Sequence, residues 1–462
     1  MPDDLLPSPL TENTPRINVG WVRLRNIRMF YDSGAIELSP TTTLFLGENA
    51  TGKSTLLRAI ALLSLGTELA NQVEERPVSY LRSGAERGFM EAVFLHHAHE
   101  DAAVGTEEFA VGLEIRQGEN SFRPMTSKDL TLGIRNCADR VDILRRRETD
   151  EFGFFCGYGP RRFFTDSGGI VPERAKATID RVVSLFVANS PVIDPDFVSK
   201  LLIGNLSNIR DAPASLDESA CSSMRASIQQ LLPDLNVLSS LSESQAQMHE
   251  SAFFFRDLSD GYAGLLALIG HLFRHALPAL RWNGNPTGIF GVALVDELDA
   301  HLHPEWQRHV LPDLRTVFPH LQIIATSHSA MVAGSVDSGA VRLLKRGENG
   351  VHMVADLPSV KGWRADQILT SILFDLPSTR SKDSEELSEY YGRMLGEHGP
   401  DHPLVRALEV QIDSQTSRIP SSSPLERVVW DLLGEFLAFR LSKISQEDLV
   451  RVKTRMWEVL RG

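Results

Sequence analysis

The stretch LFLGENATGKSTLL (residues 44–57) decides how the rest of the chain is interpreted. Its first residues, Leu44–Leu46, form a short apolar run that predicts a buried strand. Residues 47–54 then have the spacing G-x-x-x-x-G-K-S, which is the pattern of a phosphate-binding loop between a strand and a helix. Leucine and isoleucine recur at helical spacing after the loop, and Gly66 is the predicted end of that helix.

The residue types in this loop suit a polyphosphate ligand. Glycines allow the backbone to turn so that its N–H groups point inward and form a concave nest for phosphate oxygens. Lys53 can reach the β and γ phosphates, and the Ser54 hydroxyl can bind Mg²⁺. The helix that begins here directs the positive end of its dipole at the anion. We therefore expect ATP to contact the nine loop residues Gly47, Glu48, Asn49, Ala50, Thr51, Gly52, Lys53, Ser54 and Thr55.

The composition is that of an ordinary globular protein. The chain has 462 residues, of which 42% are hydrophobic and 23% charged, and this length allows two or three domains. No apolar run approaches the length of a membrane span and the N-terminal residues lack a signal-peptide pattern, so we expect a cytoplasmic protein. The net charge of −13 argues against a protein that coats nucleic acid, and 3 scattered cysteines argue against a disulfide framework or zinc site.

The regions around the loop predict an antiparallel lobe. Residues 1–17 are polar and rich in proline, and we expect a loose tail. Alternation in Val22–Ile27 and in EEFAVGLEIR (107–116) predicts strands. In EFGFFCGYGPRR (151–162), a buried strand is expected to end at a Gly-Tyr-Gly turn beside two arginines. Two interpretations stay open there: a loop that joins two lobes and places an arginine near phosphate, or a plain surface turn.

A helical insert is predicted over about residues 172–250. After it, Ser259 is expected to cap a strongly apolar helix, and Gly261 lies in the first turn of that helix without a side chain. Taken alone, these two residues indicate simple helix capping. Because a phosphate-binding loop precedes them and an acidic motif follows, we favour a second anion site at this helix N-terminus.

The acidic motif is GVALVDELDAHLHPEWQ (residues 291–307). Val292–Val295 is wholly apolar and predicts a central strand of a parallel sheet. This strand presents Asp296 and Glu297 at its carboxyl end, where open α/β sheets bind ligands. We expect Asp296 to hold Mg²⁺ through water and Glu297 to orient or deprotonate the attacking water, because burying two adjacent carboxylates for structure alone is costly.

The next apolar strand lies within LQIIATSHSAMVAG (321–334) and is expected to present His328 to the γ-phosphate. Residues 340–356 then predict a hairpin, and the remainder has helical periodicity. The predicted divisions are the tail 1–17, an ATPase head 18–345, a helical extension 346–416 and a C-terminal helical segment 424–462, which follows a Ser/Pro linker 417–424.

The order of these motifs resembles the head domain of ABC-type ATPases of the SMC/RecF/OLD group, and more closely the stand-alone ATPases of bacterial antiphage defence. Four motifs carry the likeness to the ATPase group: GENATGKSTLL (47–57), LSDGYAGLLAL (258–268), VDELDAHLHPEWQ (295–307) and FPHLQIIATSHS (318–329). Three others are similar to the Septu-type, PtuA-like ATPases: FFCGYGPRR (154–162), LFVANSPVIDPDFVSKLL (185–202) and WRADQILTSILFDLPSTRS (363–381).

The resemblance implies an α/β P-loop NTPase fold with a mixed central sheet, an antiparallel lobe, a helical insert and a helical C-terminal region. It implies hydrolysis of ATP with Mg²⁺, with Lys53, Glu297 and His328 as catalytic residues. Copies of the chain would assemble head to tail, so that Ser259 and Gly261 of one copy cap the γ-phosphate held by another. The implied partner is a separate nuclease, commonly of the HNH type, through which nucleic acid would be contacted.

The chain departs from the family pattern at several places. In the family, a glutamine usually follows the lobe-joining strand and binds Mg²⁺. Here Tyr158 and Gly159 stand in that place, which puts a Mg²⁺ ligand at this position in doubt. A proline usually follows the switch His-Ser pair, and here the residue is Ala330. The adenine-stacking residue has two candidates, Arg25 and Phe30.

Three other functions compete with that of a regulatory ATPase. A RecF-like DNA repair ATPase would bind DNA directly, but the acidic balance and the lack of an evident Lys/Arg stripe weaken this alternative. The ATP subunit of a membrane transporter fits poorly with the helical insert and the long helical C-terminus. A non-catalytic scaffold is disfavoured because the main chemical residues are all present.

Overall fold

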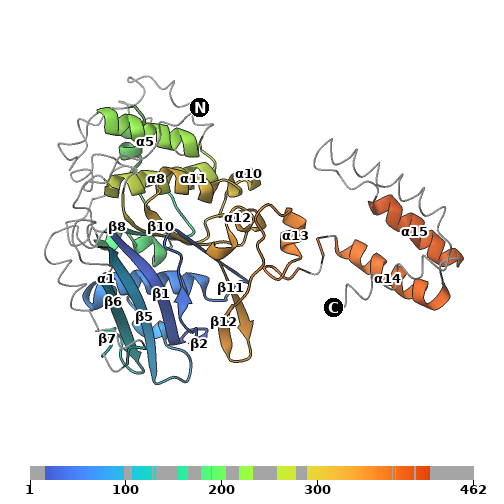
Figure 1. Cartoon of the computed structure of the whole chain (residues 1–462), viewed down its shortest axis with the longest axis horizontal. Coiled ribbons are helices and arrows are strands. Elements are labelled where there is room, and N and C mark those ends of the chain that lie inside the picture. The colour runs from blue at the N-terminus through green and yellow to red at the C-terminus, as the bar shows by residue number, and fades with distance from the viewer. Residues whose placement is uncertain are drawn as a thin grey trace. The chain divides into compact units, whose positions relative to one another are not determined.

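The computed structural model describes residues 16–97, 107–126, 129–131, 154–164, 178–188, 190–203, 218–232, 258–276, 289–376, 378–379, 381–399 and 402–416. Two compact units make up the chain, Met1–Pro377 and Ser378–Gly462. Figure 1 shows the elements of both. None of the helices in the described ranges is long and apolar enough to cross a membrane.

The first unit is built around a mixed sheet that contains the predicted phosphate-loop strand (Figure 1). Its strand order is β12-β11-β4-β10-β9-β8, and all its pairs are parallel except the edge pair β11–β12. The apolar runs GVALV and LQIIAT are buried along their whole length, as expected for parallel strands covered on both faces. The strands are β4 (Thr42–Gly47), β8 (Phe154–Tyr158), β9 (Gly291–Val295), β10 (Leu321–Thr326), β11 (Val341–Gly347) and β12 (Gly350–Val354).

A second sheet forms the predicted antiparallel lobe. Its order is β2-β1-β5-β6-β7, with β3 paired to β1. β1 already begins at Arg16, just inside the predicted tail. The strands are β1 (Arg16–Ile27), β2 (Phe30–Asp32), β3 (Ile36–Glu37), β5 (Arg87–His97), β6 (Glu107–Arg116) and β7 (Arg123–Pro124). The mixed central sheet and this lobe confirm the predicted fold class.

Helix α1 (Lys53–Val73) follows the phosphate loop and packs against both sheets. Most of its residues are buried, so it has no solvent-facing stripe over its first turns. Gly66 has φ 70° and ψ 171°, which interrupts the helix, but helical residues resume and run to Val73. The predicted end at Gly66 is therefore a break rather than a terminus, because Ala70 and Val73 beyond it still add to the core.

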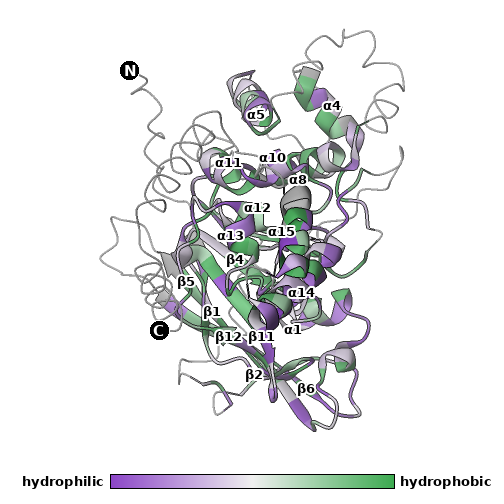
Figure 2. Ribbon diagram, turned by 90° about the vertical axis from the view of Figure 1, so that its right-hand side faces the viewer, coloured by the Kyte–Doolittle hydropathy of each residue, from purple (hydrophilic) through white to green (hydrophobic). Residues whose placement is uncertain are grey.

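The two faces of the central sheet bury two separate cores. Along β9, Ala293 and Val295 face the core under the helices, whereas Val292 and Leu294 face α1 and the antiparallel sheet. Figure 2 shows apolar positions (green) on strands and helices of this unit. The helices on the first core are α4 (Pro195–Ile203), α5 (Glu218–Leu231), α8 (Asp260–Ala276) and α11 (Val310–Val317). α4 and α5 are two described helices within the predicted helical insert.

One buried side chain joins the two sheets. Gln322 on β10 accepts a hydrogen bond from the Val19 N–H (2.8 Å) and donates to the Val19 carbonyl (2.9 Å) and the Ser39 carbonyl (2.8 Å). An amide is satisfied in such a place because it offers both donors and an acceptor. Gln322 therefore fixes the antiparallel lobe to the strand that leads to the predicted switch histidine.

The first unit extends past the predicted end of the head at residue 345. β12 pairs with β11 in the central sheet, and α13 (Ala365–Leu369) contributes Ile368 to the core, so the unit runs to Pro377. The predicted helical extension from 346 thus begins too early, because the hairpin strand belongs to the sheet. The described helices of the second unit are α14 (Lys382–His398) and α15 (Pro403–Thr416). The predicted linker 417–424 and C-terminal segment 424–462 lie outside the described residues.

Candidate functional site

The phosphate-loop motif lies between β4 and α1, as predicted. Its backbone has positive φ angles at Gly47 (149°), Ala50 (61°) and Gly52 (89°). A Cβ on Gly52 would lie 2.6 Å from the ring of Phe30, and a Cβ on Gly47 would lie 2.5 Å from the Leu344 carbonyl oxygen. Both positions therefore require glycine for space as well as for conformation.

Lys53 is the first residue of α1 and is buried. Its Nζ donates to the carbonyls of Gly47 and Glu48, both at 2.8 Å. Burial lowers the pKa of Lys53 to about 8, against the opposing charges of Asp296 and Glu297. The ammonium is thus held at the loop in a desolvated place, where a polyanion would interact with it strongly.

The acidic pair stands at the carboxyl end of β9, where the sequence predicts it. Asp296 is 2% exposed, and its Oδ1 accepts a hydrogen bond from the Thr326 hydroxyl (2.7 Å). The Glu297 N–H donates to the same hydroxyl oxygen (2.7 Å). Glu297 has φ 47°, a left-handed conformation that is uncommon outside glycine. Thr326 ends β10, and sequence reasoning did not identify its role because no motif marks it.

His328 follows β10 and its backbone N–H donates to the Asp299 carboxylate (3.3 Å). Partial burial lowers the pKa of His328, with a further lowering from the Lys53 charge, so its ring is neutral at pH 7. Ser329 caps the short helix α12 (Ala330–Ala333) and donates to Gln307 Oε1 (2.6 Å). Gln307 closes the one-turn helix α10 (Pro304–Gln307), so the switch segment and the acidic segment are joined by a side-chain hydrogen bond.

A cleft of about 240 Å³ brings most of these groups together. Asp296, Glu297 and His328 face the phosphate loop across it. Met29, between β1 and β2, also lines it and was missed, because a single methionine in a turn carries no sequence signal. The lining residues are Met29, Asn49, Ala50, Thr51, Gly52, Lys53, Ser54, Thr55, Asp296, Glu297 and His328. Of the predicted contacts, Gly47, Glu48, Ser259 and Gly261 are not among them.

The predicted second anion site lies elsewhere on the unit. Ser259 is exposed and immediately precedes α8. Gly261 packs so closely on the loop after β9 that a Cβ there would lie 2.3 Å from the His301 carbonyl oxygen. The next residue, Tyr262, makes an edge-on ring contact with Trp306 of α10, with centroids 3.8 Å apart. The turn is therefore fixed to the acidic segment of its own chain while its serine faces outward.

The lobe-joining strand differs from the prediction. The strand was expected to end at a turn formed by residues 157–159. Instead, β8 continues through Tyr158, which is buried and whose hydroxyl contacts His271 Nδ1 of α8 (2.9 Å). Arg162 turns away from the cleft. Its Nη1 donates to the carbonyls of Asp296 (2.9 Å) and Gly159 (3.2 Å), and its Nη2 to that of Glu297 (3.1 Å).

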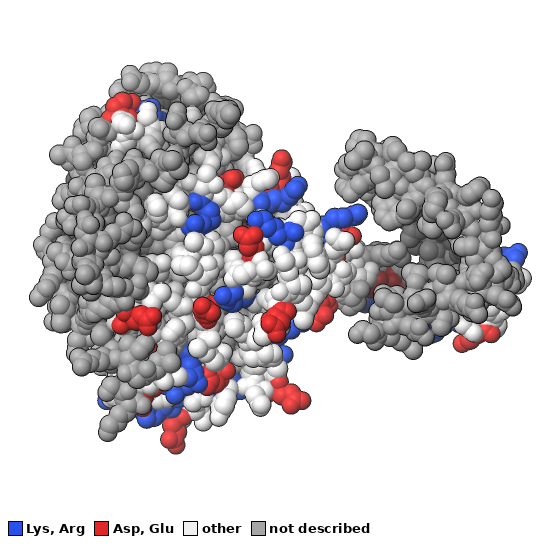
Figure 3. Space-filling view, in the orientation of Figure 1, with Lys and Arg blue, Asp and Glu red and all other residues white. Residues whose placement is uncertain are grey.

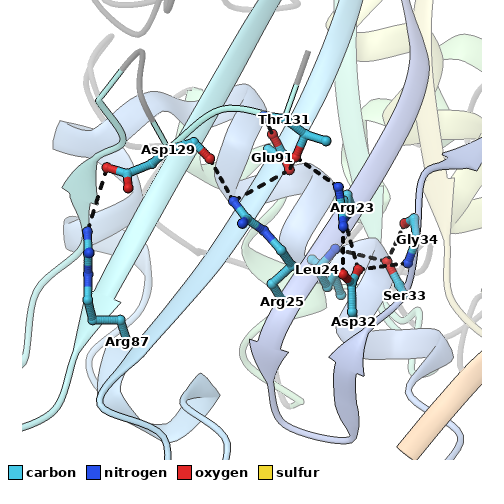
Figure 4. A network of polar contacts seen from close by, with 10 residues as sticks. All are labelled: Arg23, Leu24, Arg25, Asp32, Ser33, Gly34, Arg87, Glu91, Asp129 and Thr131. Atoms are coloured by element: carbon cyan, nitrogen blue, oxygen red, sulfur yellow. Dashed lines mark hydrogen bonds and ion pairs between the residues drawn. The ribbon is translucent and has the colours of Figure 1, made fainter. Parts of the chain in front are cut away.

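Neither candidate for adenine stacking stands free at the cleft. Phe30 is fully buried, with its ring under Gly52. Arg25 donates to the Asp129 carbonyl (2.7 Å) and lies 3.8 Å from the Glu91 carboxylate, within a polar network of the antiparallel sheet (Figure 4). Both side chains are committed to internal contacts, and their role in adenine stacking stays a prediction.

The donor set at the cleft fits Mg²⁺. Ser54 and Asp296 both line the cleft and offer a hydroxyl and a carboxylate oxygen, which are ligands that Mg²⁺ prefers. Thr326 donates to Oδ1 of Asp296, and the second oxygen of that carboxylate would face a Mg²⁺-bound water. Mg²⁺ bound there would neutralise charge on a nucleotide's phosphates.

The fold and the site define a class. The structure has a phosphate loop on a central strand of a mixed sheet, an acidic strand end two strands away and an antiparallel lobe over α1. These features fit the fold of ABC-type P-loop ATPases of the SMC/RecF group. Two protein-family models match parts of this chain, and both agree with this class. The model described as "AAA domain, putative AbiEii toxin, Type IV TA system" matches residues 232–333, and one described as "AAA domain" matches residues 22–98.

Within that class, the chain is similar to ATPases of bacterial defence systems. A Septu protein PtuA of Bacillus mycoides is 27% identical over 82% of this chain and 46% of its own length. The "Retron Ec83 probable ATPase" of Escherichia coli is 30% identical over 34% of this chain and 32% of its own length. The chain thus spans less than half the length of the curated relatives it matches. The predicted resemblance to SMC/RecF-like ATPases of defence systems is confirmed.

Solved structures offer a more distant likeness. The SMC head bound to the C-winged helix domain of ScpA is 15% identical, with a TM-score of 0.42, over 75% of this chain and 98% of that one. A likeness at this level carries no argument about function.

Proposed function

We propose that this protein binds ATP with Mg²⁺ in the cleft, hydrolyses it, and uses the bound state to assemble copies of itself that control a partner effector. One observation carries the proposal: the phosphate loop, the acidic pair and His328 converge on one cleft, whereas the Ser259–Gly261 turn lies outside it. The first group is suited to hold and cleave a triphosphate. The second is an outward-facing helix N-terminus, which is suited to contact a triphosphate that is bound to another copy of the chain.

The chemistry follows from the residues that line the cleft. Backbone N–H groups of the loop and the Lys53 ammonium would bind the phosphates, and Ser54 and Asp296 would hold Mg²⁺. Glu297 would orient the attacking water and accept its proton, and the neutral His328 ring would contact the γ-phosphate. Turnover would be slow in a single copy if the Ser259 turn of a second copy is needed to complete the site.

The partner is proposed to be a separate nuclease, of the HNH type that the resemblance implies. Direct DNA binding by this chain is less well supported, because arginines of the antiparallel sheet are paired with carboxylates. Arg23 meets Asp32 at 2.6 Å and Arg116 meets Glu114 at 2.7 Å, and Figure 4 shows the first of these pairs. On the face seen in Figure 3, basic and acidic side chains are interspersed among the described residues. DNA binding instead favours a continuous patch or stripe of basic side chains.

The test uses Glu297→Gln, which removes the proposed base and keeps the side-chain shape. We expect this variant to bind ATP, to lose turnover by about 100-fold or more, and to accumulate an ATP-dependent assembly of higher mass. Size-exclusion chromatography with light scattering, in ATP and in ADP, measures that mass. Glu305→Gln, an exposed glutamate on α10, is the matched control. An ATP-loaded Glu297→Gln that elutes as the ADP form does would contradict the assembly.

A further inference from the structure

Arg162 has hydrogen-bond partners that no phosphate-contacting role explains. Its guanidinium is almost fully buried and its recorded hydrogen bonds go to three main-chain carbonyls, those of Gly159, Asp296 and Glu297. Two of these carbonyls belong to the acidic pair itself. The side chain thus reaches from the segment after β8 to the back of the turn that follows β9.

Burying a guanidinium is costly unless its donors are satisfied, so the place needs a compensating charge. Burial lowers the pKa of Arg162 to about 10, and the carboxylates of Asp296, Asp299 and Glu297 oppose that lowering. The group therefore remains protonated at neutral pH. The side chains of Asp296 and Glu297 line the cleft, and Arg162 lies near these charges while it binds the backbone carbonyls of the same two residues.

The backbone of Glu297 is held at both ends. Its N–H donates to the Thr326 hydroxyl (2.7 Å), and its carbonyl accepts from Arg162 Nη2 (3.1 Å). The residue is in the left-handed region, with φ 47°, and such a conformation persists only where surrounding contacts impose it. Because the φ of a residue sets the direction of its Cα–Cβ bond, these two contacts determine where the Glu297 carboxylate points.

We propose that Arg162 is the positioning residue of the catalytic carboxylate: it holds the Glu297 backbone in its strained conformation, so that the side chain points into the cleft. This inference rests on the proposed function, because it assigns Arg162 a purpose only if Glu297 acts on the attacking water. Arg162 acts through the main chain and does not touch the nucleotide.

Lysine is the informative substitution, because it keeps the charge but cannot bind two carbonyls with a planar fork. For Arg162→Lys we expect the Glu297 carboxylate to be displaced and kcat to fall about 30-fold. This expected loss lies below the loss of up to about 100-fold that displacement of a catalytic group by about 1 Å can cause. We expect the Kd for ATP and the KM to stay within about twofold, because the phosphate loop is untouched. Arg161→Lys, on the exposed neighbour, is the control and should retain wild-type kcat.

A second variant separates positioning from folding. Arg162→Ala leaves a cavity that free guanidinium can enter, and addition of guanidinium at low millimolar concentration should restore part of the lost kcat. A thermal melt of each variant in the same buffer identifies any that has not folded. Loss of ATP affinity in parallel with kcat in the folded Arg162→Lys protein would overturn the inference, and so would an unchanged kcat.

The failure of the proposed function has a different signature. If wild-type protein and Glu297→Gln hydrolyse ATP equally, then Glu297 has no catalytic role and both proposals fall. If Glu297→Gln is inactive while Arg162→Lys matches wild type, the proposed function stands and the role of Arg162 is refuted.

Discussion

The cleft and the Ser259 turn are assembled in different ways. The cleft combines residues that are more than 200 positions apart in the chain, from Lys53 to His328, yet it forms within one unit. The turn is a compact local feature at the start of α8, but its exposed serine has no place among the residues that line the cleft. Distance along the chain therefore does not decide which groups act together.

The difference comes from strand direction. Because β4, β9 and β10 are parallel neighbours, their carboxyl ends lie at one edge of the sheet, and the loop, the acidic pair and His328 meet there. The Ser259 turn starts a helix instead, and its Gly261 and Tyr262 are held against His301 and Trp306. Under the proposed assembly it would reach the nucleotide of a second copy across an interface, which makes its effect on turnover the critical measurement.

The largest effect is expected in the cleft. Lys53→Ala removes the buried ammonium from the phosphate loop, and ATP affinity should fall by about 100-fold or more because a desolvated charge–phosphate contact is lost. Isothermal titration with a non-hydrolysable ATP analogue measures this affinity. Lys361→Ala, at an exposed lysine paired with Asp337, should bind as wild type does. Comparable affinities for Lys53→Ala and wild type would refute the assignment of the cleft.

A change at the turn should have the opposite profile. Ser259→Arg places a long side chain at the outward-facing helix N-terminus, and we expect turnover to fall by about 100-fold while ATP affinity changes little. Steady-state phosphate release and analogue titration give the two quantities. Ser83→Arg, at an exposed turn of the antiparallel lobe, is the control. Full turnover in Ser259→Arg would reduce Ser259 to a helix cap.

The smallest effect concerns the buried contact of Tyr158 on β8 with His271 on α8, the helix that begins at the Ser259 turn. Burial lowers the pKa of His271 to about 3, with smaller contributions from Arg181 and Arg274, whereas an unfolded histidine titrates near 6.5. Below pH 6.5, His271 therefore binds a proton in the unfolded chain but stays neutral in the folded chain until the pH approaches 3. Stability is fully present above that pH and declines toward pH 3, by about 2 kcal/mol between pH 7 and pH 5.

Thermal unfolding of wild type and His271→Phe at the two pH values tests this. The variant should lose less stability on acidification than wild type, since its phenyl ring does not titrate. Tyr158→Phe removes the hydroxyl partner and keeps the histidine, so its decline should match that of wild type. Identical declines in all three proteins would show that His271 is not the group responsible.

The sequence predicted those parts of the site that directly follow a single buried strand. Asp296 and Glu297 follow an apolar run that can only be a buried strand, so their position at a sheet edge was foreseeable. The same holds for the phosphate loop after β4 and for His328 after β10. Such features depend on local pattern and on the direction of parallel strands, which a single sequence contains.

Other features depend on contacts between distant segments and could not be foreseen. Arg162 was expected near phosphate or in a surface turn, but the direction of its side chain is set by the carbonyls of the acidic turn. Met29 lines the cleft, and its backbone is held by β12, where the Val351 N–H donates to the Met29 carbonyl (3.0 Å). Neither contact leaves a periodic signal in the sequence.

The single-turn helix α10 touches both regions at once. Trp306 rests against Tyr262 at the base of the outward turn, while its neighbour Gln307 binds the serine that caps the helix after His328. A displacement of the histidine segment would act through that serine–glutamine hydrogen bond on the helix that carries Trp306. Under the proposed assembly, this one-turn helix would couple the occupancy of the cleft in one copy to the contact that the same copy makes with its neighbour.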